Sequence, residues 1–133
     1  MRRHTLKLIN PIMVIDDDAS LLGFTAKYLT RLGYSVATYR NSEQAWKDFR
    51  ASAANYALVL IDLSLGGLSG AQLSQMMLNA NPAVRLIVMS GYPFDPEKLR
   101  EVDPDRMAFL HKPFTPAMLA ETVDRMLGSA GGR

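Results

Sequence analysis

The sequence has 133 residues, of which 48% are hydrophobic and 21% are charged, a mixture typical of one folded domain that argues against a disordered or fibrous chain. It contains no cysteine, which excludes disulfides, thiolate metal sites and thiol catalysis. The formal net charge is only +2 and the basic residues are scattered, so the composition disfavours nucleic-acid binding.

The N-terminal segment, residues 1–11, is basic and then briefly apolar before Pro11 interrupts the run. That run is too short for the core of a signal peptide, and every apolar run of the chain falls far below the roughly 20 residues that span a membrane. We therefore expect a cytoplasmic protein without membrane contact. Its predicted parts are an N-terminal arm at 1–11, one domain at 12–128 and a flexible tail at 129–133.

Five segments are predicted to be β-strands. Residues 12–15, 57–61 and 86–89 are apolar runs of the kind that form buried strands, and residues 107–110 form a weaker run. Residues 34–39 alternate polar and apolar side chains and are rich in β-formers, as expected of an edge strand.

Four other segments carry apolar residues three or four positions apart, which predicts helices with one apolar face. The positions are Leu22, Ala26, Leu29 and Leu32; Ala45, Trp46, Phe49 and Ala53; Leu73, Met76, Met77 and Ala80; and Leu119, Val123, Met126 and Leu127. The third helix is predicted to end near Asn81-Pro82, and the last to lie between Thr115-Pro116 and Gly128. Residues 95–105 predict only a short helix, because Pro104 must close it.

The alternation of strands and helices predicts an α/β fold in which helices cover both faces of a parallel sheet. In such a sheet, ligands bind beyond the carboxyl ends of the strands. Those ends carry carboxylates, one hydroxyl and one ammonium group, from Asp16, Asp17, Asp18, Asp62, Ser90 and Lys112.

These side chains favour a divalent cation and phosphoryl chemistry. Carboxylates placed close together raise one another's pKa unless a cation joins them. Oxygen ligands without His or Cys suit Mg²⁺, which also screens the approach of an anionic phosphoryl donor. Asp62 is the best candidate for a nucleophile that forms an acyl phosphate, because it lies centrally at the end of an apolar strand. Asp18 is instead expected to cap the helix that begins near Ala19.

Four short motifs resemble, in order and spacing, those of the CheY-like receiver domain of bacterial response regulators. They are IMVIDDD at 12–18, LVLIDL at 58–63 followed by Gly70, VMSG at 88–91 and FLHKPF at 109–114. The resemblance that they carry covers nearly the whole chain. The resemblance implies a flavodoxin-like (βα)5 fold with a doubly wound, five-stranded parallel sheet in strand order 2-1-3-4-5.

The resemblance also implies a role for each site residue. Asp62 is similar to the phosphoacceptor, and the implied Mg²⁺ site consists of Asp17 as a direct ligand, Asp16 acting through a metal-bound water, Asp62 itself and the backbone carbonyl of Ser64. Ser90 resembles the switch hydroxyl and Lys112 the lysine that pairs with the phosphoryl oxygens, with a cis peptide before Pro113. Phe109 matches an aromatic switch position, although a plain core aromatic is the alternative.

A chain of this family would take its phosphoryl group from a histidine kinase or a histidine phosphotransfer protein and would not be a conventional turnover enzyme. Phosphorylation would switch the surface of the fourth helix, fifth strand and fifth helix toward an unknown downstream protein, in a monomer or a weak phosphorylation-dependent dimer. Thr25, Lys27 and Tyr28 would lie near the kinase-docking face. The initial Met and the lack of an effector domain favour a free regulator over a receiver cut from a hybrid kinase.

The sequence departs from the family pattern in two places. Gly66 stands where the family usually has proline, so the loop after Asp62 is expected to be more flexible, and the short helix near 97–102 departs from a standard dimerising face. Ser64 and Tyr92 occupy positions that tune phosphoryl lifetime in the family.

Two alternatives remain open at this point. A haloacid-dehalogenase-type phosphatase would use the Asp-x-Asp spacing of Asp16 and Asp18, but it leaves Asp62 unexplained and needs a further acidic metal site, for which only Glu121 and Asp124 follow Lys112. A degenerate receiver would act as a binding module without phosphorylation.

Overall fold

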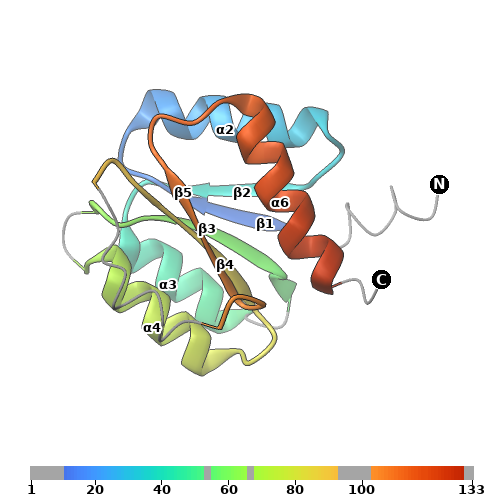
Figure 1. Ribbon diagram of the computed structural model, residues 1–133. Coiled ribbons are helices and arrows are strands. Elements are labelled where there is room, and N and C mark those ends of the chain that lie inside the picture. Colours follow the sequence, from blue (N-terminus) through green and yellow to red (C-terminus); the bar gives the residue numbers. More distant parts are fainter. Residues whose placement is uncertain (1–10, 53–54, 66–67, 93–102, 131–133) are drawn as a thin grey trace.

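The computed structural model describes residues 11–52, 55–65, 68–92 and 103–130, and the fold is built from these (Figure 1). Most of the short helix predicted within 95–105 lies outside the described residues. The same is true of Ala53 and Gly66, and of nearly all of the predicted arm.

The five strands form one parallel sheet. They are β1 (Ile12–Ile15), β2 (Val36–Tyr39), β3 (Leu58–Asp62), β4 (Arg85–Ser90) and β5 (Met107–His111). Their order is β2-β1-β3-β4-β5, which confirms the expected order and the edge position of the alternating segment. Each observed strand lies within two residues of its predicted bounds.

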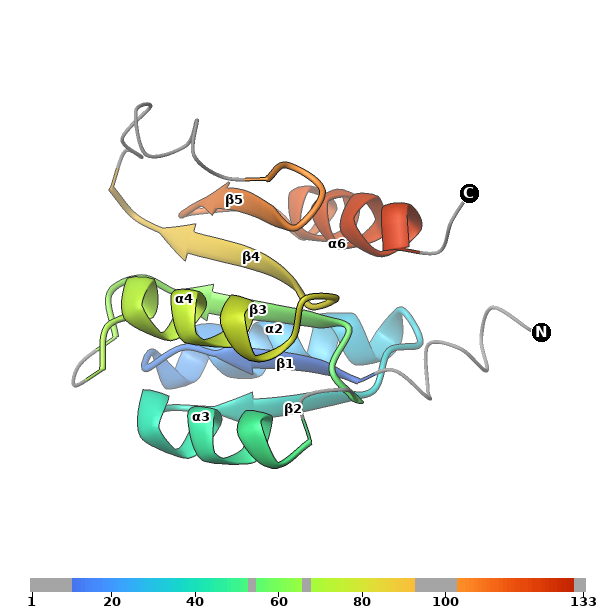
Figure 2. The same cartoon turned by 90° about the horizontal axis from the view of Figure 1, so that it is seen from below.

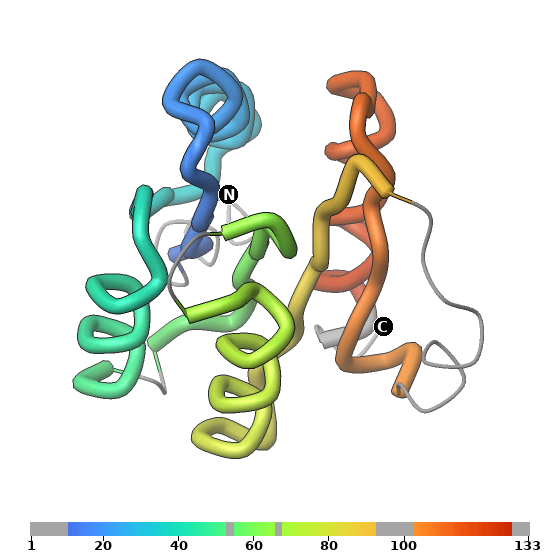
Figure 3. The backbone as a smooth tube through the Cα atoms, turned by 90° about the vertical axis from the view of Figure 1, so that its left-hand side faces the viewer, coloured from blue at the N-terminus to red at the C-terminus, as the bar shows by residue number. Residues whose placement is uncertain are grey.

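The helices cover the sheet on both faces, as the doubly wound fold requires. The helices α2 (Ala19–Arg31) and α6 (Pro116–Ala130) lie on one face, and α3 (Ser42–Ala51) and α4 (Gly70–Ala80) lie on the other (Figures 1 and 2). On that second face α3 and α4 are neighbours, as the backbone tube also shows (Figure 3). Among the described residues, no helix has the length and apolar character that crossing a membrane requires.

Strand β1 contributes side chains to two hydrophobic cores, one on each face of the sheet. Ile12 and Val14 pack under α2 and α6, whereas Met13 and Ile15 pack under α3 and α4. All four side chains are fully buried, because successive strand residues point to opposite faces and both faces are covered. Full burial of such a side chain contributes about 1.5–3 kcal/mol, so the central strands are fixed from both sides.

The helices begin at the polar caps that the sequence provides. Asp18 accepts a hydrogen bond from the Leu21 amide (3.1 Å), which confirms its predicted capping role. Ser69 and Gln72 form a reciprocal capping box at the start of α4. The end of α4 at Ala80, just before Asn81-Pro82, is also confirmed.

The predicted end of α6 before Gly128 is wrong, because the helix passes through Gly128 and ends at Ala130. Glycine stops a helix when it adopts a left-handed conformation. Among the described glycines only Gly33, after α2, does so, with φ at 101°. Gly128 therefore remains helical, at the modest cost that glycine has inside a helix.

One expectation about α2 is also wrong. Thr25, expected near a docking face, is only 1% exposed and lies on the side that faces the sheet. The reason is its spacing, since it comes three residues after Leu22 and four before Leu29, which are both buried. Lys27 is exposed, and Tyr28 is half-buried against the core.

Candidate functional site

The carboxyl edge of the sheet brings together the polar residues that the sequence singled out. Asp16 directly follows β1, Asp62 ends β3, Ser90 ends β4 and Lys112 directly follows β5. Parallel pairing sets these strand ends level, because Asp62 lies opposite Met89 and the next pair along β4 joins Ser90 to His111. The sheet itself therefore collects side chains that lie up to 96 residues apart in sequence.

Asp16 is held at this edge by contacts on both of its carboxylate oxygens. Its Oδ1 accepts a hydrogen bond from the Asp18 amide at 2.9 Å, and its Oδ2 lies 3.0 Å from Lys112 Nζ. Its own amide donates to the Tyr39 carbonyl at 3.1 Å. With 1% of its surface exposed, the carboxylate has a fixed orientation.

Asp62 is fixed in a similar way. Its Oδ1 accepts a hydrogen bond from the Ser64 amide at 3.0 Å, and its Oδ2 lies 3.4 Å from Lys112 Nζ. Asp62 is 3% exposed. Lys112 therefore bridges two buried carboxylates from neighbouring strands, and its backbone is fixed by a 2.8 Å hydrogen bond to the Ser90 carbonyl.

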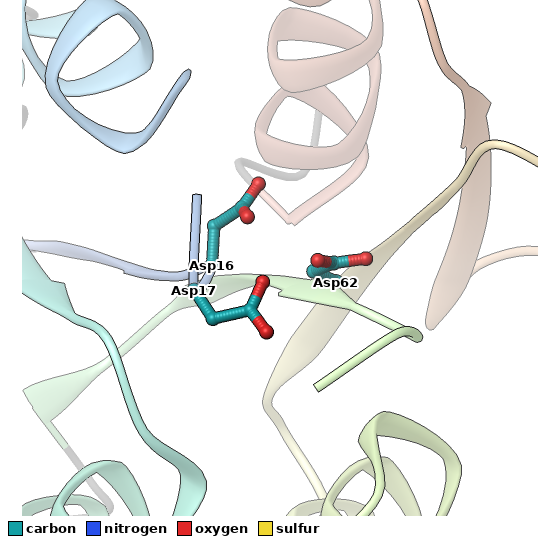
Figure 4. Close-up of side chains that lie close together, drawn as sticks. All are labelled: Asp16, Asp17 and Asp62. Atoms are coloured by element: carbon teal, nitrogen blue, oxygen red, sulfur yellow. The ribbon is translucent and has the colours of Figure 1, made fainter. Parts of the chain in front are cut away.

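Three carboxylates converge at this edge (Figure 4). One oxygen each of Asp16, Asp17 and Asp62 lies within 4.8 Å of the others, and Asp17 is the exposed member. All of these donors are oxygens, which suits a hard cation, and the exposed side leaves room for the water ligands that Mg²⁺ retains. The cluster fits Mg²⁺. Ser64, whose carbonyl was expected to be a further ligand, lies in the exposed turn directly after β3.

Burial and the ion pairs set the charges of the site. Burial raises the pKa of Asp16, although the Asp18 amide and Lys112 offset part of this effect. Burial alone would lower the pKa of Lys112, but its hydrogen bonds with Asp16 and Asp62 and the charge of both carboxylates raise it. The site therefore keeps a cationic ammonium group beside Asp62, where an incoming anion would be attracted.

Ser90 ends β4, and Phe109 lies within β5. Ser90 is 4% exposed, and its hydroxyl oxygen accepts a hydrogen bond from the Tyr92 amide at 3.0 Å. Phe109 is half-buried and pairs with Val88 across the strands. The peptide between Lys112 and Pro113 is cis, as expected.

Asp18 does not share the environment of the other three aspartates. It is exposed and its carboxylate caps α2, so the Asp16 and Asp18 spacing does not bury two carboxylates side by side. This removes the feature that favoured a phosphatase.

Two features beside the site were missed in the sequence. A Cβ atom on Gly70 would lie 2.4 Å from the Asp62 carbonyl oxygen, so α4 starts directly against the backbone of Asp62. The Leu68 amide donates a hydrogen bond to Glu43 of α3 at 3.3 Å. No local pattern signals either contact, because each joins elements that meet only in the folded chain.

The sequence of the chain matches a known family over most of its length. The sequence model described as the response regulator receiver domain matches residues 12–124. The nitrogen assimilation regulatory protein NtrX of Azorhizobium caulinodans is 26% identical over 122 residues, which are 90% of this chain and 26% of NtrX. The transcriptional regulatory protein ResD of Bacillus subtilis is 24% identical over 119 residues, which are 90% of this chain and 48% of ResD. The chain thus spans less than half the length of either relative.

Solved structures share the fold. A CheY-like response regulator receiver domain protein from Methanospirillum hungatei superposes with a TM-score of 0.82 at 23% identity, covering 93% of this chain and 98% of that one. The BeF3-activated receiver domain of DrrB, from Thermotoga maritima, gives a TM-score of 0.76 at 26% identity, covering 91% and 99%. With the family match over 12–124, these likenesses lead to one conclusion: the chain belongs to the response regulator receiver domain family of two-component systems.

Proposed function

We propose that this receiver domain accepts a phosphoryl group on Asp62, in the presence of Mg²⁺, from a phosphorylated histidine of a histidine kinase or histidine phosphotransfer protein. The observation that carries the proposal is the position of Lys112 Nζ, 3.0 Å from Asp16 and 3.4 Å from Asp62, both buried at one edge of the sheet. A carboxylate held beside a fixed cation is arranged to react with an anionic electrophile.

The residues that would hold Mg²⁺ are Asp17 and Asp62 directly, Asp16 through a water molecule and Ser64 through its carbonyl. Support comes from the three carboxylate oxygens within 4.8 Å of one another and from the all-oxygen donor set. When bound, the ion would neutralise charge on the phosphoryl oxygens during transfer.

In the proposed transfer, one carboxylate oxygen of Asp62 attacks the phosphorus atom and forms an O–P bond. The N–P bond to the donor histidine breaks, and its electron pair stays on the imidazole, whose other nitrogen carries the proton that keeps the leaving group neutral. Lys112 is close enough to Asp62 to pair with the transferred phosphoryl oxygens. The Ser90 hydroxyl, at the end of the adjacent strand, would donate a hydrogen bond to them.

The aspartyl phosphate would act as a signal. Its charge and acceptor oxygens would draw the Ser90 hydroxyl inward and bias the position of Phe109 on β5, which alters the surface next to β5 and α6. That surface would bind a downstream protein, in a monomer or a weak phosphorylation-dependent dimer. The names of NtrX and ResD, which describe regulatory proteins, support a role in such signalling. In this role the domain is a phosphoacceptor and not a conventional turnover enzyme.

The test is the intact mass of the protein after treatment with acetyl phosphate, with and without Mg²⁺, for wild type, Asp62→Asn and Asp18→Asn. The proposal expects one Mg²⁺-dependent phosphoryl adduct in wild type and in Asp18→Asn, whose residue caps a helix, and none in Asp62→Asn. No adduct in wild type with fresh donor and metal would instead favour a receiver that acts as a phosphorylation-independent binding module.

A further inference from the structure

The turn after Asp62 is held partly by its own residues. The Ser64 amide donates to Asp62 Oδ1, and the Leu65 side chain is buried in the core beneath α3 and α4. Farther along, the capping box of Ser69 and Gln72 fixes the first turn of α4. The hydrogen bonds among these contacts join residues that are close in sequence. The burial of Leu65 is a hydrophobic contact, which has no preferred direction.

One further contact reaches this segment from another element. Glu43, in the first turn of α3, accepts a hydrogen bond from the Leu68 amide at 3.3 Å through its Oε2. Its Oε1 lies 3.5 Å from the Ser42 hydroxyl. The helix α3, which carries Glu43, is packed firmly against the core, because its residues Ala45 and Phe49 are fully buried. A carboxylate acceptor makes a stronger hydrogen bond with an amide than a neutral acceptor does.

The Leu68 contact is joined to the proposed phosphoacceptor Asp62 through the close packing of Gly70. Gly70, two residues after Leu68, packs so closely on the strand that a Cβ there would lie 2.4 Å from the Asp62 carbonyl oxygen and 2.7 Å from Leu63 Cα. Both are backbone atoms, which cannot rotate away as a side chain can. A shift at the start of α4 is therefore passed to the backbone of Asp62.

The sequence explains why an external contact matters here. The two residues between Leu65 and Leu68 are glycines, which have no side chain with which to anchor themselves. Glycine also loses more conformational entropy than any other residue when its backbone is fixed. The family's usual proline at Gly66 would restrict the backbone, and this chain lacks it.

We propose that Glu43 is a positioning residue for Asp62: by accepting the Leu68 amide hydrogen, it fixes the start of α4 and so the turn that carries Asp62 and Ser64. This inference rests on the proposed phosphoacceptor function of the site. Glu43 itself does not touch the reacting atoms in this arrangement; it acts through Leu68 and Gly70.

The test compares Glu43→Ala, which removes the acceptor, with Glu43→Gln, which keeps a neutral acceptor and removes the charge. Gln44→Ala is the matched control, because Gln44 lies next to Glu43 on α3 and its side chain contacts Asp48 of the same helix. Three quantities are measured for each protein: amide hydrogen exchange at Leu68, Mg²⁺ affinity by calorimetry, and the rate of phosphorylation by acetyl phosphate.

Glu43→Ala is expected to speed amide exchange at Leu68, to weaken Mg²⁺ binding and to slow phosphorylation. The changes in Mg²⁺ affinity and in phosphorylation rate should each be about 3- to 10-fold, which is the factor that the loss of one net hydrogen bond gives in an equilibrium constant. Glu43→Gln should restore most of each property, and Gln44→Ala should behave as wild type. A mere loss of α3 stability would not give rescue by Gln, because both Glu43 variants lose the same favourable charge at the helix N-terminus.

Two results would overturn the proposal. If Glu43→Gln behaves as Glu43→Ala does, the charge and not the hydrogen bond is responsible. If Glu43→Ala leaves exchange at Leu68 unchanged, the contact does not hold the segment. Failure of the phosphoacceptor function is distinguishable from both, since wild type would then give no adduct while the exchange at Leu68 still reports on the Glu43 contact.

Discussion

Lys112 Nζ lies between two carboxylates, 3.0 Å from Asp16 Oδ2 and 3.4 Å from Asp62 Oδ2, so one ammonium group joins the ends of neighbouring strands β1 and β3. Lys112 itself follows β5, at the far edge of the sheet. The ion pairs hold the fifth strand's carboxyl end over the centre of the site. Lys112 also supplies the positive charge that a phosphoryl group would meet there.

Replacing Lys112 by methionine separates its two effects on the site. The change removes charge that would stabilise the transferring phosphoryl group, so phosphorylation by acetyl phosphate should fall by about 100-fold. The same change removes repulsion of a bound cation, so Mg²⁺ should bind more tightly, by roughly 5-fold for about 1 kcal/mol. Rates from intact mass and affinities from calorimetry would check both, and weaker Mg²⁺ binding in Lys112→Met would contradict this view of the charges.

The raised pKa of Asp16 predicts that this carboxylate destabilises the fold without metal. A carboxyl whose pKa is higher in the folded state stabilises the protein below its ordinary pKa, and this contribution is lost as the pH rises through the raised value. Asp16→Asn should therefore melt at a higher temperature than wild type at pH 7 without Mg²⁺, and the difference should shrink toward pH 3. Thermal unfolding across this range is the measurement.

Added Mg²⁺ provides the control for Asp16. It should raise the melting temperature of wild type by mass action and have a smaller effect on Asp16→Asn. Equal responses of the two proteins to Mg²⁺ would count against Asp16 as part of the metal site.

Gly70→Ala tests the close approach of α4 to the strand. The added methyl group meets backbone atoms at 2.4 and 2.7 Å, so the change should lower the free energy of unfolding by about 1–3 kcal/mol and slow phosphorylation of the folded protein. Gly23→Ala in α2 is the matched control, because nothing lies within 4 Å of its Cβ position. Alanine at position 23 should raise the free energy of unfolding by about 0.5–1 kcal/mol. Denaturant unfolding would measure both changes, and equal effects would refute the steric reasoning.

The sequence predicted the strands and the grouping of the site residues because both depend on local patterns, whereas the strand order came from the family resemblance. Apolar runs marked the buried strands, and the carboxyl edge of a parallel sheet necessarily gathers the side chains at the strand ends. The sequence alone therefore predicted one shared site for Asp16, Asp62, Ser90 and Lys112. The roles assigned to them, including the metal ligands and Phe109, stay predictions.

The features that the sequence did not reveal depend on contacts between distant segments. Glu43 reads as an ordinary first-turn acid, and only the packing of α3 beside α4 brings it to Leu68. Thr25 was expected near the docking face of the first helix, although its spacing from Leu22 and Leu29 places it inside. Gly128 was read as a helix stop because glycine often follows the last residue of a helix, whereas the stop depends on a backbone conformation that this glycine does not adopt.

The most direct test of the central claim identifies the residue that receives the phosphoryl group. Protein treated with acetyl phosphate and Mg²⁺ is reduced with borohydride, which converts an aspartyl phosphate to homoserine, and is then mapped by peptide mass spectrometry. Asp62 should be converted, while Asp16 and Asp17 in the same cluster should remain unchanged. Conversion at Asp16 or Asp17, or at no aspartate, would contradict Asp62 as the phosphoacceptor.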